Sequence, residues 1–475
     1  MASRPGILRP GCYRFRSSIH QRGQILILFG LSLIVLIGAV GLAVDSGRAY
    51  GVRARLNAAV DAASIAAARA LAVGADDAAR ISNAQAAAAR FFQLNYPADF
   101  LGSTPSAPTT SAVREASGRW RVSVSATANM PTSFIRVLGR TDVGVAAAGE
   151  AIRRDLDVVL VMDTSGSLGP PYSPASTFPT LKSAAINGFI KKFSSGAGGD
   201  RVGLVSFSSG AVLDVPINRD ATRGFDSGVI QAAINALPLG GATASAEGMR
   251  RGLDELNTVP VALRSSLRVI LFFSDGAPNL VSGTFPRSSG SPNPITGNLY
   301  SDISGSGSGA ADRMWRDNAR NDAYYAGDAD GSGSTITNIS SLPSTGAGGI
   351  PLASFDGKRT LTGSPYQNTR CNVNKAARNM VERVANTARG DDIRIYTIGL
   401  GDPLNTLETS FSGGNCGYTL ANEKGSTILK RLANSADSDS RNDAQPQGLY
   451  CHAATATDLD RCFSTIASEI LRLTL

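Results

Sequence analysis

Five oxygen-bearing side chains in three parts of the sequence have the chemistry of a site for a divalent cation. They are two carboxylates and three hydroxyls: Asp163, Ser165, Ser167, Thr243 and Asp275. Hard cations such as Mg²⁺ and Mn²⁺ prefer oxygen ligands, and Mg²⁺ takes six of them and usually keeps several waters. Because five protein groups leave the coordination incomplete, the pattern predicts an open Mg²⁺ or Mn²⁺ site with room for a carboxylate from a protein partner.

The surrounding sequence predicts that parallel strands position these side chains. Continuous apolar runs are typical of strands buried on both faces of a sheet, and they occupy 157–162, 201–207, 267–273 and 393–400. Helical patterns alternate with them at 177–193, 228–237, 244–256, 374–388 and 458–473. The alternation predicts an α/β, Rossmann-like fold with a central, mostly parallel sheet and helices on both faces. Ligands of such sheets bind at the carboxyl ends of the strands, where Asp163 and Asp275 fall.

The same motifs resemble the von Willebrand factor A domain and its metal-ion-dependent adhesion site. The similarity covers about 153–278 and 371–475, and it rests on Asp-Thr-Ser-Gly-Ser after an apolar run, Gly-Gly-Ala-Thr before a helix, and Ser-Asp-Gly. It implies that Ser165, Ser167 and Thr243 coordinate the metal directly, whereas Asp163 and Asp275 anchor the shell around it. The alternative is an A domain with the same fold that holds no metal.

A long segment, 279–370, interrupts this resemblance close to Asp275. It is rich in Ser, Gly, Asn and Asp, and it could cover the metal site or carry a binding surface of its own. Within it, 327–334 is as oxygen-rich as a calcium loop but lacks the EF-hand spacing, so a solvated loop is the default interpretation. Trp315, Tyr324 and Tyr325 could pin part of the segment or form a sticky patch.

The N-terminal region has the pattern of a membrane anchor. Residues 25–44 contain no charged side chain, and twenty helical residues span about 30 Å, the thickness of a bilayer's hydrocarbon core. Residues 1–22 hold five arginines and no acidic residue. The positive-inside rule therefore predicts a single pass through a bacterial inner membrane, with a cytoplasmic N-terminus and a C-terminal domain that is periplasmic or at the cell surface. A cleaved signal peptide is the alternative interpretation.

Beyond the apolar run the sequence predicts helices followed by strands. The helical pattern continues over 45–72, a second helix covers 76–94, and strands follow at 119–128 and 142–152. Most of 20–150 resembles the N-terminal region of TadG-like proteins of the tight-adherence (Flp) pilus assembly system. The resemblance rests on the stretches 22–24, 44–45, 56–68 and 130–139, and it implies association with pilus-assembly membrane proteins.

These segments give four predicted parts. They are a basic cytoplasmic tail (1–22), a transmembrane helix (23–44), a TadG-like helical stalk with a small α+β region (45–152), and a von Willebrand factor A domain with its insert (153–475). Cys12 lies in the tail. The other cysteines, Cys371, Cys416, Cys451 and Cys462, lie far beyond the anchor. In an exported region they could form two disulfides with three possible pairings, or remain free buried thiols.

Composition and motifs exclude several classes of function. His20 and His452 are the only histidines, so a multi-histidine metal site is impossible, and His452 is expected to pack near the final strand. Much of the net positive charge of +8 lies in the tail, which disfavours a nucleic-acid binder. No phosphate loop, nucleophile elbow or His-Glu-x-x-His motif occurs, so no enzymatic activity is expected.

The sequence therefore predicts a membrane-anchored pilus-assembly and adhesion protein. Its A domain would bind an acidic residue of a protein partner through the divalent metal. The alternative is a structural scaffold of a secretion or pilus machine with no metal-dependent ligand binding.

Overall fold

A computed structural model describes residues 22–71, 74, 76–115, 119–288, 294–301, 308–316, 338–354, 356–405 and 423–474. The chain divides into two compact units. The first consists of Met1–Ala63, Ala89–Thr109 and Val124–Gly149, and the second of Ser64–Ala88, Thr110–Ser123 and Glu150–Leu475. Several sequence predictions lie outside the described residues: the basic tail up to residue 21, the calcium-like segment 327–334, Tyr324, Tyr325, Cys12 and Cys416.

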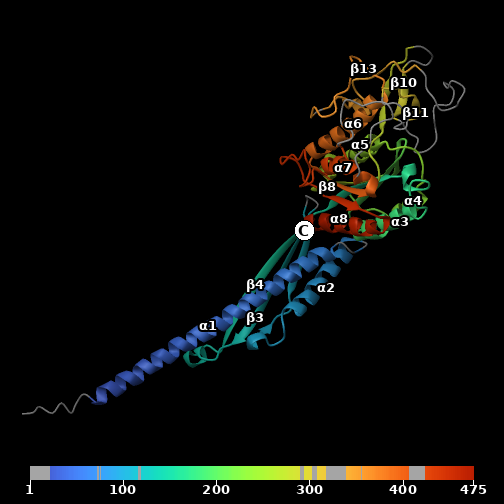
Figure 1. The fold of residues 1–475 in the computed structure, drawn as a ribbon. Helices are drawn as coiled ribbons and strands as arrows, with labels where there is room; N and C mark the ends of the chain where they lie inside the picture. Colours follow the sequence, from blue (N-terminus) through green and yellow to red (C-terminus); the bar gives the residue numbers. More distant parts are fainter. Residues whose placement is uncertain are drawn as a thin grey trace, which may run out of the picture. The chain divides into compact units, whose positions relative to one another are not determined.

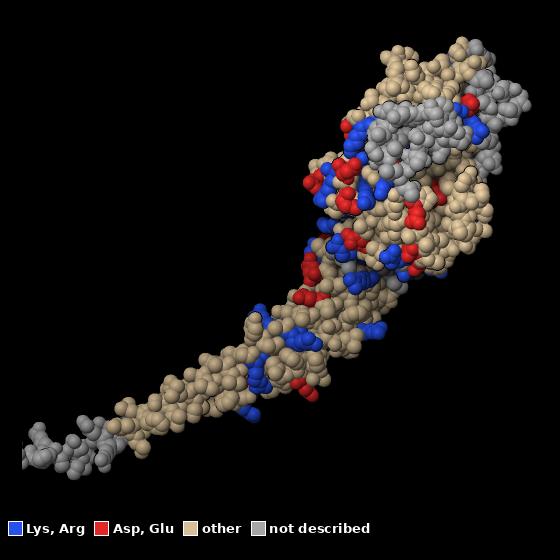
Figure 2. Space-filling view, in the orientation of Figure 1, with Lys and Arg blue, Asp and Glu red and all other residues tan. Residues whose placement is uncertain are grey.

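Helix α1 (Arg22–Ala70) is continuous over 49 residues and contains the apolar run. Between Ile25 and Val44 its large apolar side chains are 43% to 75% exposed, and Figure 2 shows no charged surface along this stretch. It is the one helix within the described residues that is long and apolar enough to cross a membrane. A continuous exposed apolar surface of this kind is typical of a segment that contacts lipid or another protein.

A small sheet and a second helix follow α1. Helix α2 spans Asp77–Asn95, and the strands are β1 (Thr104–Pro105), β2 (Thr109–Arg114), β3 (Trp120–Pro131) and β4 (Asp142–Arg153). β3 pairs with the other three strands. Its residues alternate between buried and more exposed positions, as expected for a strand with one apolar face. The helix predicted at 76–94 and the strands predicted at 119–128 and 142–152 are all present.

The second unit is built on a six-stranded sheet in the order β15-β14-β8-β5-β6-β7. The strands are β5 (Leu156–Asp163), β6 (Arg201–Phe207), β7 (Ala211–Val215), β8 (Leu267–Ser274), β14 (Ile393–Leu400) and β15 (Tyr450–Ala453). All neighbours are parallel except β6 and β7. Every residue of β5, β6 and β8 is buried, because helices cover both faces. The predicted fold class is confirmed.

Helices lie on both sides of this sheet (Figure 1). Alternate strand residues belong to two separate cores. Val159 and Val161 of β5 pack with α5 (Ser245–Asn257), α6 (Arg370–Gly390) and α7 (Gly425–Ala433) on one face. Leu160 and Met162 pack with the helices on the other face: α3 (Thr177–Ala184), α4 (Ser227–Ala236) and α8 (Leu459–Leu473).

One predicted helix is divided. The pattern over 177–193 becomes α3, a π-helical turn (Ala185–Phe189) and a 3₁₀ turn (Ile190–Lys192). Gly188 in the π turn lies against α8, where an added Cβ would approach the Phe463 Cβ to 2.9 Å. The π-helical turn therefore lies where α8 packs closest to this segment. Single π-helical turns of this kind interrupt otherwise regular helices.

The insert contributes its own sheet. β9 (Leu280–Phe285), β10 (Ile295–Tyr300) and β11 (Arg313–Trp315) are antiparallel, and β12 (Ser341–Leu342) pairs with β13 (Tyr366–Gln367). Val281, Leu299 and Met314 are fully buried in the same core as α6. The described part of the insert is thus an added layer of the second unit.

A buried ion cluster fastens the insert to α6 and α7. Arg359, from the insert, is fully buried and donates hydrogen bonds of 2.6 to 3.1 Å to the carboxylates of Glu382 and Glu423. Arg378 and Arg431 donate to Glu423 as well. Burial alone would raise the pKa of Glu423, but the charges of Arg359 and Arg378 and their hydrogen bonds outweigh it and lower the pKa to about 2.

Two of the four cysteines beyond the apolar run form a disulfide that joins β15 to α8, Cys451–Cys462. Cys371 is also disulfide-bonded. Of the two alternatives for the cysteines beyond the apolar run, disulfides rather than free thiols, the structure supports disulfides for these three residues.

Candidate metal site

The ends of two neighbouring parallel strands bring the candidate residues together. Asp163 is the last residue of β5, and Asp275 follows the last residue of β8. The strands are in register, with Met162 opposite Phe273. Ser165 and Ser167 lie on the turn after β5, which includes a 3₁₀ segment (Gly166–Leu168).

Hydrogen bonds connect four of the five candidates. The Ser165 backbone N–H donates to Asp163 Oδ1 over 2.8 Å, and the Ser167 hydroxyl donates to Asp275 Oδ1 over 2.8 Å. The two serine Oγ atoms are 2.9 Å apart, and Ser165 Oγ lies 3.5 Å from Asp275 Oδ1. Both carboxylates and both serine hydroxyls therefore form one cluster.

Thr243 lies beside this cluster, at the entrance to α5. Its hydroxyl would be 3.7 Å from a Cβ added at Gly276, the residue after Asp275. Its backbone N–H donates to Asn279 Oδ1 over 2.9 Å. The loop before it is held to the β5 turn by two backbone hydrogen bonds, Gly166 N–H to Gly241 O (3.1 Å) and Gly240 N–H to Thr164 O (3.0 Å). All five predicted residues thus meet at one edge of the sheet.

The cluster is rich in negative charge that the protein does not neutralise. Asp163 is fully buried. Burial raises the pKa of Asp163 and of Asp275, and the neighbouring charge of Asp163 raises the pKa of Asp275 further. Among the ion pairs of the described residues, no lysine or arginine reaches either carboxylate. Two adjacent carboxylates without a basic partner are stabilised in their ionised form by a cation.

The donor set fits a hard divalent cation. The groups are carboxylate and hydroxyl oxygens, which suit Mg²⁺ or Mn²⁺. Within the described part of the chain, no three or more His, Cys, Asp or Glu side chains gather as they would around zinc. The residues present therefore fit the cation predicted from the sequence.

Two residues that the sequence analysis did not single out also support the site. The Ser274 hydroxyl donates to Asp163 Oδ2 over 2.6 Å, and Asn279 holds the Thr243 backbone as described above. Ser274 stands in the Ser-Asp-Gly motif, so its position carried a signal. Asn279 carried none, because its role depends on the fold of the insert.

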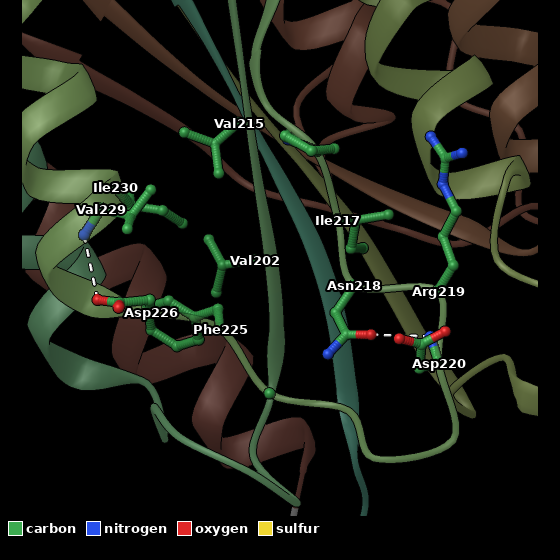
Figure 3. A pocket seen from close by; sticks show the side chains of 12 residues that line it. Val202, Val215, Ile217, Asn218, Arg219, Asp220, Phe225, Asp226, Val229 and Ile230 are labelled. Carbon is green, nitrogen blue, oxygen red and sulfur yellow. Dashed lines mark hydrogen bonds between the residues drawn. The ribbon is translucent and has the colours of Figure 1, made fainter.

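The pocket in Figure 3 is a different feature. It measures about 690 Å³ and lies near the start of β6, at Val202, whereas the candidate residues lie beyond the carboxyl ends of the strands. Its polar groups serve the local backbone: Asp226 Oδ1 accepts from the N–H groups of Gly228 and Val229 at the start of α4, and Asn218 Oδ1 accepts from the Asp220 N–H. The pocket contributes nothing to the metal site.

His452 lies on the last strand, β15, as expected. Its Nε2 is 2.9 Å from Asn405 Nδ2 and its Nδ1 is 3.1 Å from the Tyr450 hydroxyl.

Family comparisons agree with this architecture. Residues 158–277 match the model of the von Willebrand factor type A domain, and residues 23–70 match that of the Flp pilus-assembly TadE/G-like family. No match was found among curated proteins.

Three similar solved structures have low sequence identity to the chain. The vWF domain of the type V pili tip protein Mfa5 from Porphyromonas gingivalis is 16% identical with a TM-score of 0.38, over 68% of this chain and 98% of that one. The pilus adhesin SpaC from Lactobacillus rhamnosus GG is 13% identical with a TM-score of 0.36, over 77% and 34%. Proximal thread matrix protein 1 from the mussel byssus, with a zinc-occupied MIDAS motif, is 13% identical with a TM-score of 0.32, over 68% and 46%. This chain therefore spans less than half of the last two. The chain therefore combines a segment that matches the TadE/G-like family model with a segment that matches the von Willebrand factor type A model.

Proposed function

We propose that this protein is a membrane-anchored pilus-assembly and adhesion component whose A domain binds a carboxylate of a protein partner through a divalent cation. The observation that carries the proposal is the pair of carboxylates, Asp163 and Asp275, which meet at two strand ends without a basic partner among the described ion pairs. Binding rather than turnover is the activity.

Each residue of the site has a defined task in this proposal. Ser165, Ser167 and Thr243 would hold the cation through their hydroxyl oxygens, while Asp163 and Asp275 supply the negative charge around it. A bound Mg²⁺ or Mn²⁺ would supply an open coordination position for the partner's carboxylate. The chain itself keeps the five groups in place, since Ser274 orients Asp163 and two backbone hydrogen bonds join the loops.

Residues of the insert lie next to the candidate metal site and form part of its border. Leu280 and Trp315 pack against Ala244, the residue after Thr243. Tyr300 is only partly buried, and its ring meets that of Trp315 edge to face, with centroids 5.3 Å apart. Trp315 is buried and supports Tyr300. The partly exposed Tyr300 ring would provide contact area for a partner, so the insert would contribute to the choice of partner.

The membrane anchor would determine on which side of the membrane this binding domain lies. The 23–44 stretch of α1 would cross a bacterial inner membrane with residues 1–22 in the cytoplasm, leaving 45–152 as the stalk and 153–475 periplasmic or at the cell surface. The exposed apolar surface of α1 and the TadE/G-like match support this arrangement. Other pilus-assembly membrane proteins are the expected neighbours of the helix.

Cation titration of the full-length protein in detergent tests the proposal. After removal of metal with a chelator, calorimetry with Mg²⁺ and Mn²⁺ should show one saturable binding event that Asp163→Ala and Ser165→Ala abolish. Asp443→Ala is the control, because the Asp443 side chain is 83% exposed at the surface. Circular dichroism establishes that each variant is folded, and a folded wild-type protein that binds neither cation refutes the metal site.

A scaffold without metal-dependent binding is the second candidate. The hydrogen bond from Ser167 to Asp275 favours it, because the cluster is already partly organised by protein groups. Capture of pilus-assembly proteins distinguishes the two: release by chelator and by Ser165→Ala supports adhesion through the metal, whereas capture that neither affects supports the scaffold.

A further inference from the structure

The turn between β3 and β4 is clamped to α1 at the end of the apolar stretch. The carboxylate of Asp45 accepts hydrogen bonds from three successive backbone N–H groups of this turn: Ser133 (3.0 Å), Phe134 (2.8 Å) and Ile135 (2.8 Å). Asp45 is only 1% exposed. Three amide donors on one carboxylate hold the turn in a single position on the helix.

Arg48, one turn further along α1, reinforces the clamp. Its Nη1 donates to the Ser133 hydroxyl over 2.7 Å, and its Nη2 donates to the carbonyl oxygen of Leu101 over 2.9 Å. Its Nη1 also lies 3.7 Å from Asp45. The clamp therefore joins the helix to two loops of the first unit.

Phe134 lies against the helix inside the apolar run. A Cβ added at Gly41 would approach the Phe134 Cβ to 2.4 Å, so the aromatic residue occupies the space that a side chain at position 41 would need. Gly41 precedes Val44, the last residue of the run, by three positions, which is about 5 Å along a helix. Phe134 therefore lies level with the apolar stretch.

The turn exposes apolar side chains beside basic and aromatic ones. Val137 at its tip is 88% exposed and Phe134 is 45% exposed, while Tyr50 on α1 is 77% exposed. Arg136 and Arg140 of the turn are exposed as well. Exposed apolar side chains with arginines close by in the same turn are typical of segments in the interface between lipid headgroups and acyl chains.

We propose that the turn 132–140 enters the membrane interface next to α1 and contacts lipid through Phe134 and Val137, with Arg136 and Arg140 at the headgroup phosphates. The proposal rests on the membrane anchoring of α1 proposed above. If α1 spans the bilayer, its apolar run is just long enough for the hydrocarbon core. The clamp holds the turn level with the last residues of that run. A turn at this depth would be surrounded by lipid, so lipid is the expected partner.

The depth of single probes in lipid vesicles tests this inference on the full chain. An environment-sensitive fluorophore is attached to Val137→Cys in a Cys12→Ser background, and the protein is reconstituted in phosphatidylcholine and phosphatidylglycerol vesicles. Two further positions calibrate the readout: Leu31→Cys in the apolar run, and Tyr172→Cys, which is 78% exposed in the second unit. Labelling of the parent without the added cysteine is subtracted. Brominated lipid and aqueous iodide are the quenchers.

The expected result is a blue-shifted probe at position 137 that brominated lipid quenches, as at position 31, while iodide quenches the probe at 172. Lipid quenching at 31 but iodide quenching at 137 overturns the inference and leaves the anchor intact. A probe at 31 that stays accessible to iodide refutes the anchor itself. A probe at 137 shielded from both quenchers indicates a protein partner, and this also overturns the lipid contact.

A variant of Asp45 tests whether the clamp sets the depth of the turn, or whether the turn binds lipid through its own apolar side chains alone. Asp45→Ala removes the acceptor of the three amides, so lipid quenching at 137 should fall while quenching at 31 is unchanged. If lipid quenching at 137 is the same in Asp45→Ala as in the parent, the clamp does not set the depth of the turn and that part of the inference is wrong.

Discussion

Glu423→Gln should destabilise the second unit by about 3 kcal/mol at neutral pH. Glu423 is 3% exposed and receives hydrogen bonds from Arg359, Arg378 and Arg431. The neutral amide would leave three buried guanidinium groups with fewer carboxylates to balance them. Because Arg359 belongs to the insert, the variant also tests whether this cluster fastens the insert to the A domain.

The magnitude follows from the pKa of Glu423. Its pKa falls from 4.5 to about 2 in the folded protein, and each pKa unit corresponds to about 1.4 kcal/mol, so the ionised side chain stabilises the fold by about 3 kcal/mol. Removing one member of a buried ion pair independently costs about 3–5 kcal/mol. The two routes therefore give the same order of magnitude.

The sign of the pH dependence is also determined. A carboxylate with a lowered folded-state pKa stabilises the protein fully above its unfolded pKa of 4.5, and the contribution is lost as the pH falls through about 2. The stability difference between wild type and Glu423→Gln should accordingly shrink as the pH is lowered from 5 toward 2. Asp439, whose pKa is also lowered to about 2, changes in the same direction, but solvent weakens its effect because its side chain is 48% exposed.

Urea unfolding of the full-length protein in detergent, followed by circular dichroism at several pH values, measures these differences. Asp443→Asn is the matched control, since its ion pair with Arg441 is at the surface and contributes less than about 1 kcal/mol. A loss below about 1 kcal/mol for Glu423→Gln, or a loss that does not change with pH, would refute the reasoning.

Two further substitutions test other contacts of the second unit. Arg80→Ala should cost at least about 2 kcal/mol in urea unfolding, because the buried guanidinium donates to four backbone carbonyl oxygens; they belong to Leu71, Gly74, Ser195 and Ala197. Arg90→Ala, on the exposed side of the same helix, is its control and should change stability by less than about 0.5 kcal/mol. Cys451→Ser should cost about 3 kcal/mol under oxidising conditions, since the Cys451–Cys462 disulfide closes a loop with a sequence separation of 11. Under reducing conditions that difference should disappear, and a persistent difference would assign the loss to packing instead.

The central sheet could be predicted because its strands carry a strong local signal. The strands β5, β6, β8 and β14 are continuous apolar runs, and helices with one apolar face separate them. The site followed from the same logic, since parallel neighbours in register bring Asp163 and Asp275 to one edge. In both cases the local pattern identified the strands, and the rule that ligands bind at the carboxyl ends of parallel strands supplied the long-range contact.

The insert and the clamp on α1 could not be predicted because they depend on distant pairings. The strands β9 and β10 contain glycine, serine, threonine and asparagine, and they become buried only when they pack on α6. Strand β7 and helix α7 are short and were not predicted. The stretches 44–45 and 130–139 both stood out in the sequence, but the hydrogen bonds that the backbone N–H groups of Ser133 and Phe134 donate to Asp45 join residues that are 88 and 89 positions apart.

Buried carboxylates in this chain differ in what compensates their charge, and this difference supports the metal site. Asp45 receives three backbone amides, and Asp157 receives the guanidinium groups of Arg201 and Arg223 at 3.2 Å together with the Ser265 N–H. These two carboxylates are neutralised or solvated by the protein itself. Asp275 receives hydroxyl groups of the two serines instead, and the nearest charge acting on it is the like charge of Asp163. Hydroxyl oxygens can coordinate a cation as readily as they donate a hydrogen bond, so this carboxylate pair, unlike the other two acids, has a ligand set that a divalent cation would complete.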